Sequence, residues 1–350
     1  MTNRRTFLAG LAALALPKPT WADVGGPACL SAGQEGKGFV LHGLTATGDS
    51  LFRVGLPARG HAATAHPTRP LAVAFARRPG TFAVVLDCLS GIVSHQLTPP
   101  KGRQFNGHGA FSKDGSTLYT SEVVAETSEG RIGLWDTARF TRSGDVASGG
   151  IGPHDIKRRP DGSLIVANGG IATDPADRTK LNLDSMRPNL TLLSADGEII
   201  DQTELPPDLH QNSIRHLALQ GDAIAFAMQW EGDPAVPVPQ LGQWLPGSDP
   251  VLCPPDDAQM FAMQGYAGSI AATDSRIALT SPRGGVVMVF DAAGMPIATH
   301  RRADICGIAA AADGFIATDG AGAVWRLTDS GLPPLARHAT LWDNHLIALG

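Results

Sequence analysis

The sequence predicts an all-β protein, a seven-bladed β-propeller whose last blade is closed by strands from both ends of the chain. Three observations predict this fold. The composition is rich in turn-forming residues, one short motif recurs about every 47 residues, and the two chain ends carry complementary parts of one blade. Four-stranded propeller blades repeat at similar intervals, and ring closure removes the two free sheet edges.

Composition favours short strands and tight turns over helices. The 350 residues include 41 Gly and 26 Pro, and only 17% are charged. All-β chains of this length commonly form one domain. The net charge of −5 comes without any long basic run. Nucleic acid is therefore a poor candidate partner, since phosphate binding needs a positive surface.

The N-terminus has the pattern of an export signal. Asn3-Arg4-Arg5-Thr6-Phe7-Leu8 resembles the twin-arginine motif, and the apolar run Leu8–Leu16 is too short to span a membrane. Thr20-Trp21-Ala22 offers small residues for cleavage. We therefore expect a signal peptide over 1–22, a propeller over 23–350, a periplasmic location and no membrane span in the mature chain. The alternative is a cytoplasmic protein whose N-terminus is basic by chance.

The spacing of the four cysteines matches no common metal-binding or haem-binding motif. Cys29, Cys88, Cys253 and Cys306 show no CxxC or CxxCH spacing. An oxidising periplasm allows one or two disulfides among them. The sequence leaves their pairing open.

The recurring motif is a Gly or Pro, usually a His, an apolar strand, a turn with Asp or Gly, and a second apolar strand. Its copies begin at Gly60-His61, Gly107-His108, Pro153-His154, Arg215-His216, Ala267-Gly268 and Ile305-Cys306, and a seventh begins at Asn344-His345.

The strands that follow each motif copy complete the blades. Second strands are expected at Leu71–Phe75, Leu118–Ser121, Leu164–Ala167, Ile224–Ala227, Ile277–Thr280 and Phe315–Thr318. Third strands are expected at Thr81–Leu86, Ile132–Trp135, Leu190–Leu193, Val286–Phe290 and Ala323–Leu327. The seventh blade takes its inner strand from 345–349 and the others from Ala28–Ala32, Gly38–Gly43 and Leu51–Val54. A miscount in the irregular region Gln229–Pro254 would give six or eight blades.

The histidines of the motif occupy one position in five of the seven blades. The first strand of a blade lines the central channel, so their imidazoles should converge at its mouth. Imidazole is the commonest protein ligand for copper, zinc and ferrous iron. We therefore predict a metal site with copper as the first candidate and iron or zinc as alternatives. Its expected ligands are His61, His108, His154, His216, His345 and, from the sixth blade, Cys306.

The alternative is a structural histidine that bonds within its own blade, as in WD repeats, which Trp135-Asp136 resembles in one blade. The residues around the histidines vary, which favours the metal site. Strand alternation predicts that Asp155 and Arg215 point away from the channel. The long loops Gly169–Asn189 and Gln229–Gly247 should lie at the same rim as the histidines and cover it.

Two other functions remain open. A lactonase-like enzyme acting on a small ligand would need acid–base and cationic groups at the rim, for which Arg215, Glu122 and His154 are candidates. A scaffold that binds other proteins would need no metal. The sequence has no GxSxG, Walker-type or HExxH motif, so it does not predict the common hydrolase, nucleotide-binding or zinc-protease sites.

Several strings in the middle of the chain resemble a family of uncharacterised bacterial exported propellers, classified as a domain of unknown function. They are Asn106–Gly115, Gly152-Pro153-His154, Val166–Ile171, Leu181–Met186 and Ser213–Leu217. Members of that family are associated with imelysin-like, iron-regulated periplasmic proteins. The resemblance implies partners among periplasmic iron-uptake proteins and a role in iron acquisition, through copper-dependent redox handling of iron.

Overall fold

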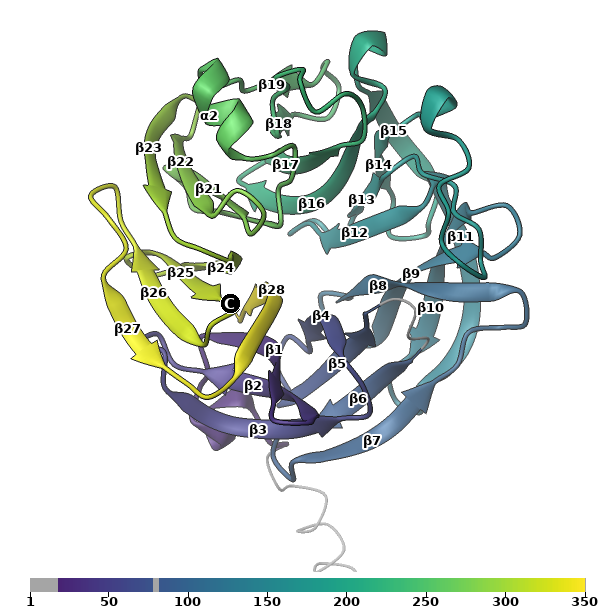
Figure 1. The fold of residues 1–350 in the computed structure, drawn as a ribbon. Coiled ribbons are helices and arrows are strands. Elements are labelled where there is room, and N and C mark those ends of the chain that lie inside the picture. The colour runs from purple at the N-terminus through teal and green to yellow at the C-terminus, as the bar shows by residue number, and fades with distance from the viewer. Residues whose placement is uncertain (1–17, 78–81, 350) are drawn as a thin grey trace, which may run out of the picture.

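The computed structural model describes residues 18–77 and 82–349, and these form a ring of seven four-stranded antiparallel sheets around a central channel (Figure 1). The prediction of a seven-bladed propeller is confirmed. The predicted twin-arginine motif and the apolar run after it lie outside the described residues. Among the described residues, no helix is long and apolar enough to cross a membrane.

Six blades are continuous in sequence, and their strands run from the channel outward in chain order. Blade 1 comprises β4 (Gly60–Ala65), β5 (Leu71–Ala76), β6 (Ala83–Asp87) and β7 (Ile92–Leu97). Blade 2 comprises β8 (Arg103–Phe111), β9 (Thr117–Val124), β10 (Glu129–Asp136) and β11 (Thr141–Ile151). Blade 3 comprises β12 (Pro153–Arg158), β13 (Leu164–Asn168), β14 (Asn189–Leu193) and β15 (Ile199–Glu204). Blade 4 comprises β16 (Asn212–Gln220), β17 (Ala223–Trp230), β18 (Leu241–Trp244) and β19 (Val251–Leu252). Blade 5 comprises β20 (Ser269–Ala272), β21 (Arg276–Ser281), β22 (Val286–Asp291) and β23 (Pro296–Arg301). Blade 6 comprises β24 (Ile305–Ala311), β25 (Gly314–Asp319), β26 (Ala323–Leu327) and β27 (Pro334–Arg337).

Blade 7 joins the two ends of the chain, as predicted. Its strands are β28 (Leu341–Ala348), β1 (Cys29–Glu35), β2 (Gly38–Leu44) and β3 (Ser50–Leu56). The C-terminal strand β28 is innermost and pairs with β1 from Cys29↔Ala348 to Gln34↔Leu341. Because β28 also contacts both β24 and β4, the seven innermost strands form a closed ring.

The short helices of residues 18–77 and 82–349 lie outside the strands of the blades. They are the 3-10 helices η1 (Trp21–Val24), η2 (Leu183–Ser185) and η3 (Pro207–Leu209) and the α-helix α2 (Asp257–Ala262). The helix η2 belongs to the long loop between β13 and β14. The second long loop connects β17 to β18. Both loops therefore fall between the second and third strands of a blade.

The core consists of apolar clusters that lie between neighbouring blades. Between blades 1 and 2, for example, Phe75 contacts Phe105, which in turn contacts Trp135. Middle strands such as β5 are buried on both faces, which explains why they read as continuous apolar runs and not as alternating ones.

The four cysteines belong to this core as free, buried thiols. Burial raises the pKa of Cys29, Cys88 and Cys306 to about 12 and that of Cys253 to about 11. At neutral pH they are therefore uncharged and pack as small apolar side chains.

Closure of blade 7 can be tested with one buried and one exposed leucine of β28. Leu346 is 4% exposed and packs in the cluster between blades 6 and 7, whereas Leu341 is 53% exposed. We expect Leu346→Ala to lower the free energy of unfolding by about 2–4 kcal/mol. Leu341→Ala should change it by no more than about 0.5 kcal/mol. Urea denaturation measures both, and equal effects would contradict the importance of this closure.

Candidate metal centre

A β-bulge interrupts the innermost strand of each blade that carries a motif histidine. The register shifts between Gly60 and Ala63 in β4, around His61, and between Pro153 and Asp155 in β12, around His154. Similar shifts occur in β8, β16 and β28. In blade 5, which has Gly268 at this position, β20 pairs with β21 without a shift. Because a bulge adds a residue to one strand, it re-aims a side chain that plain alternation would place elsewhere.

Gly107 shows why a glycine precedes one of these histidines. Its φ is +98°, a conformation that L side chains rarely adopt. A Cβ atom there would lie 2.6 Å from Cδ2 of His61. The glycine therefore lets the chain turn at the bulge and lets the His61 ring pack against the backbone beside His108.

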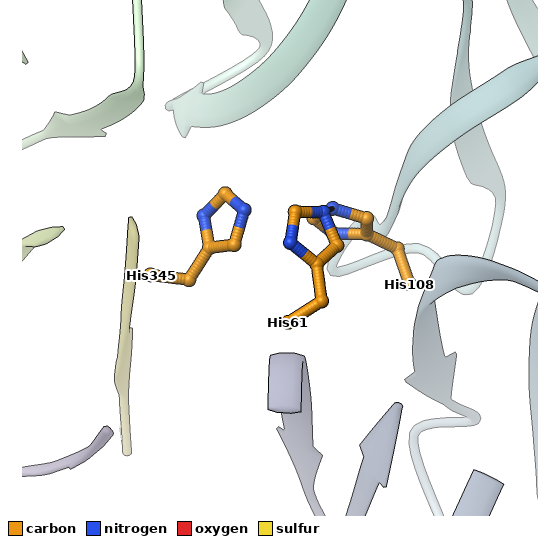
Figure 2. A group of neighbouring side chains, drawn as sticks. All are labelled: His61, His108 and His345. Atoms are coloured by element: carbon orange, nitrogen blue, oxygen red, sulfur yellow. Dashed lines mark hydrogen bonds between the residues drawn. The ribbon is translucent and has the colours of Figure 1, made fainter. Parts of the chain in front are cut away.

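The five motif histidines converge at one end of the channel, as predicted from the sequence. The five histidines come from blades 7, 1, 2, 3 and 4, which are consecutive around the ring. His108, from the middle one of these blades, has a ring contact with each of the other four imidazoles. The ring centroids of these contacts are 4.8 to 5.7 Å apart. Figure 2 shows His61, His108 and His345 facing one another from separate strands. The Nε2 atoms of His61 and His108 are 3.2 Å apart.

Burial keeps several of these imidazoles uncharged. It lowers the pKa of His154 and of His345 well below 6.5, and neighbouring histidines lower both further. Burial lowers the pKa of His216 to about 3, with a further contribution from His108. A neutral imidazole has a lone pair on one ring nitrogen, which is the form that binds metals. Nδ1 of His154 and Nε2 of His345 have no hydrogen-bond partner among the described residues.

Asp155 orients His108 from the neighbouring blade. Its Oδ1 lies 3.2 Å from Nδ1 of His108, and its Oδ2 accepts a hydrogen bond from the backbone N–H of Leu217. Burial opposes ionisation of Asp155, but Lys157 and His108 hold its pKa below the usual range. A carboxylate at Nδ1 fixes the tautomer in which Nε2 carries the lone pair.

Two groups of imidazoles have ligand atoms close enough to hold a metal ion. They are His61, His108 and His345, and His108, His154 and His216; within each, the ligand atoms lie within 4.8 Å of one another. His108 belongs to both groups. Cys306 belongs to neither, because its thiol packs in the core between blades 6 and 7 and donates to the backbone carbonyl of Thr318.

A cavity of about 210 Å³ opens above the histidines. Arg215 lines it, although strand alternation predicted that this side chain points away. The prediction was wrong because the register of β16 shifts between Ile214 and His216, so Arg215 is the extra residue of the bulge. The loop between β13 and β14 contributes Arg178 and Lys180 to the same cavity. This loop therefore lies at the histidine rim, as predicted.

The acid–base set considered for an enzyme is not brought together. Glu122 is fully buried in blade 2, where it pairs with Arg142 at 2.6 Å and accepts a hydrogen bond from Thr120. It is not among the described residues that line the cavity with Arg215 and His154.

Histidines elsewhere in the fold bond to groups outside the cluster. Nδ1 of His66 accepts hydrogen bonds from the backbone N–H groups of Thr68 and Arg69. His42 contacts Ser50 and Glu35, and Nε2 of His338 lies 2.8 Å from the carbonyl oxygen of Gly48. These side chains are structural elements of their turns and strands. The five imidazoles in the channel instead contact one another across blades, which supports a different role for them.

The fold and site define this protein as a β-propeller with a histidine cluster at the mouth of its channel. The chain belongs to the family described as "Protein of unknown function (DUF1513)", whose model matches residues 54–349. No curated protein matches it.

Solved structures resemble the chain in fold alone. Hydrazine synthase of Kuenenia stuttgartiensis is 14% identical, with a TM-score of 0.60 over 84% of this chain and 92% of that chain. The WD40 repeats of RRP9 are 11% identical, with a TM-score of 0.60 over 92% of this chain and 91% of that one. The computationally designed protein Ika8 is 15% identical, with a TM-score of 0.55 over 89% and 84%.

The lowered pKa of His66, a histidine outside the cluster, predicts that the stability of the protein depends on pH. Burial and the nearby Arg69 lower its pKa to about 4 in the folded protein, whereas an unfolded histidine has a pKa of about 6.5. Between these pH values the unfolded chain binds more protons, so His66 makes the protein less stable as the pH falls. His66→Asn retains an acceptor for the turn but does not titrate. The stability gap between wild type and variant should shrink by roughly 2 kcal/mol from pH 7 to pH 5. Urea denaturation at each pH measures it, and parallel curves would contradict the prediction.

Proposed function

We propose that this protein binds a transition-metal ion in the periplasm, with copper as the first candidate and iron or zinc as alternatives. The single observation that carries the proposal is the convergence of five imidazoles from five blades, four of them buried, with His108 in contact with the other four. Copper, zinc and ferrous iron favour imidazole nitrogen, whereas calcium and magnesium favour oxygen ligands. The periplasmic location rests on the twin-arginine pattern of the N-terminus.

The spacing of the nitrogen atoms supports one ion bound next to His108. Two nitrogen ligands about 2.0 Å from a tetrahedral metal lie about 3.3 Å apart, and the Nε2 atoms of His61 and His108 are 3.2 Å apart. Because Nδ1 of His108 is bonded to Asp155, this side chain offers one nitrogen to one ion. The two candidate groups thus compete for His108, and we propose a single ion held by His108 with two or more of its neighbours.

The imidazole nitrogens are better candidate metal ligands than the sulfur of Cys306. The pKa of the Cys306 thiol is raised to about 12 by burial, so the sulfur stays protonated at neutral pH. Only a thiolate is a good metal ligand. We therefore leave Cys306 out of the proposed ligand set. A link to iron acquisition and to periplasmic iron-uptake partners, implied by the family resemblance, is part of the proposal.

The first test is elemental analysis of protein purified without a histidine tag and with its export signal intact. We expect about one equivalent of copper or iron in the wild type. A His108→Ala/His154→Ala variant should lose it, because each candidate group contains at least one of these residues. A His95→Ala/His210→Ala variant is the control, since neither residue lines the cavity.

Circular dichroism should show that the first double variant keeps its fold. Stoichiometric metal in that variant would refute the proposed ligands. A wild type that binds no metal even after reconstitution would refute the function.

A second test addresses how Asp155 orients the cluster. Asp155→Asn weakens the hydrogen bond that fixes His108, so metal affinity should fall about 10- to 100-fold. Lys157→Met is the matched control, because Lys157 pairs with the same carboxylate but is not among the potential metal ligands. Competition with a chromophoric chelator measures both affinities. Equal affinities in Asp155→Asn and Lys157→Met would show that the orientation of His108 does not matter.

A further inference from the structure

The cavity above the histidines is strongly cationic. Five basic side chains line it, and Glu231 is the one carboxylate among its described lining residues. The basic residues come from four blades: they are Arg77, Arg178, Lys180, Arg215 and Arg283. Convergence of like charges from separate blades is unfavourable by itself, because each charge repels the others. Their convergence therefore needs an explanation beyond stability.

Two carboxylates, Asp343 and Glu231, pair with basic residues of this cavity. Asp343 pairs with Arg77 at 2.7 Å but also with Arg59 at 2.7 Å. Glu231 pairs with Lys180, and its other oxygen is 3.9 Å from Arg215. Each carboxylate is thus shared between two cations, so the charges of Arg77, Lys180, Arg215 and Arg283 exceed those of the carboxylates paired with them.

Arg215 is the clearest sign of an unmet partner. Its side chain is 11% exposed, and its Nε has no hydrogen-bond partner among the described residues. A buried guanidinium normally has its N–H groups satisfied, because an unpaired buried donor costs free energy. Arg283 likewise contacts no carboxylate among the described residues and stacks on the Tyr266 ring at 4.2 Å.

We propose that this cavity binds a small, multiply charged oxyanion, a carboxylate or a phosphate, between Arg215 and Arg283 and directly above the histidines. Guanidinium groups bind the oxygens of both chemistries through paired hydrogen bonds. A cavity of about 210 Å³ has room for a phosphate or a small dicarboxylate. The site does not require the metal.

The test is isothermal titration calorimetry with two probes, inorganic phosphate and succinate. The protein is first made metal-free with a chelator, which gel filtration then removes. We expect one probe molecule to bind per chain, more weakly as salt rises. Arg215→Gln and Arg283→Gln should each weaken binding about tenfold or more. The second variant is included because Arg215 is buried and its replacement can affect folding.

Arg276→Gln is the matched control. Arg276 lies at the opposite end of β21 from Arg283, pairs with Asp329 and does not line the cavity. This variant should bind both probes like the wild type. Stronger binding of succinate would identify a carboxylate ligand, and stronger binding of phosphate would identify a phosphate-bearing one.

Failure of the wild type to bind either probe would overturn the proposal, as would unchanged affinity in a folded Arg283→Gln variant. Because these titrations use metal-free protein, their outcome is independent of the metal analysis. Loss of the anion site would leave the metal proposal standing, and the reverse also holds.

Discussion

Pairing of β28 with β1 closes the ring, and both the core and the histidine cluster depend on it. Each apolar cluster lies between two blades, so no blade buries its own faces alone. An open ring would expose the faces of two blades and two strand edges. Closure also places His345, near the end of the chain, with its ring centroid 4.6 Å from that of His61. Stability and the site therefore arise from the same contact between the termini.

The fold could be predicted because its main signals are local and repeated. Alternating or continuous apolar strands and turn residues recur in each blade, and the copies confirm one another. The convergence of the five histidines followed from this repeat, since equivalent residues of a propeller lie at equivalent places around its axis. Blade 4 gave the weakest signal because its third strand, β18, has only four residues and follows an irregular loop.

The rest of the site depended on features without a sequence period. The bulge in β16 turns Arg215 into the cavity, and alternation cannot reveal a bulge. Arg178 and Arg283 lie in connections between strands, where the chain path follows tertiary contacts. Cys306 occupies the repeat position of a histidine, but the pocket between blades 6 and 7 holds its thiol in the core. Residues at equivalent positions of a repeat therefore have equivalent backbone positions, but their side chains can point in different directions.

The cationic cavity and the histidine cluster constrain each other electrostatically. Neutral imidazoles contribute no charge to offset a metal cation, and the carboxylate of Asp155, which contacts His108, is shared with Lys157. A divalent ion in the cluster would also be repelled by the buried Arg215. Coulomb interactions at such short range are large where water is excluded. An oxyanion between the arginines and the histidines would offset the positive charges of the metal ion and of the arginines. Its oxygens would also be available as ligands to the metal. Metal and anion would then each strengthen the binding of the other, as linkage requires when two ligands interact favourably.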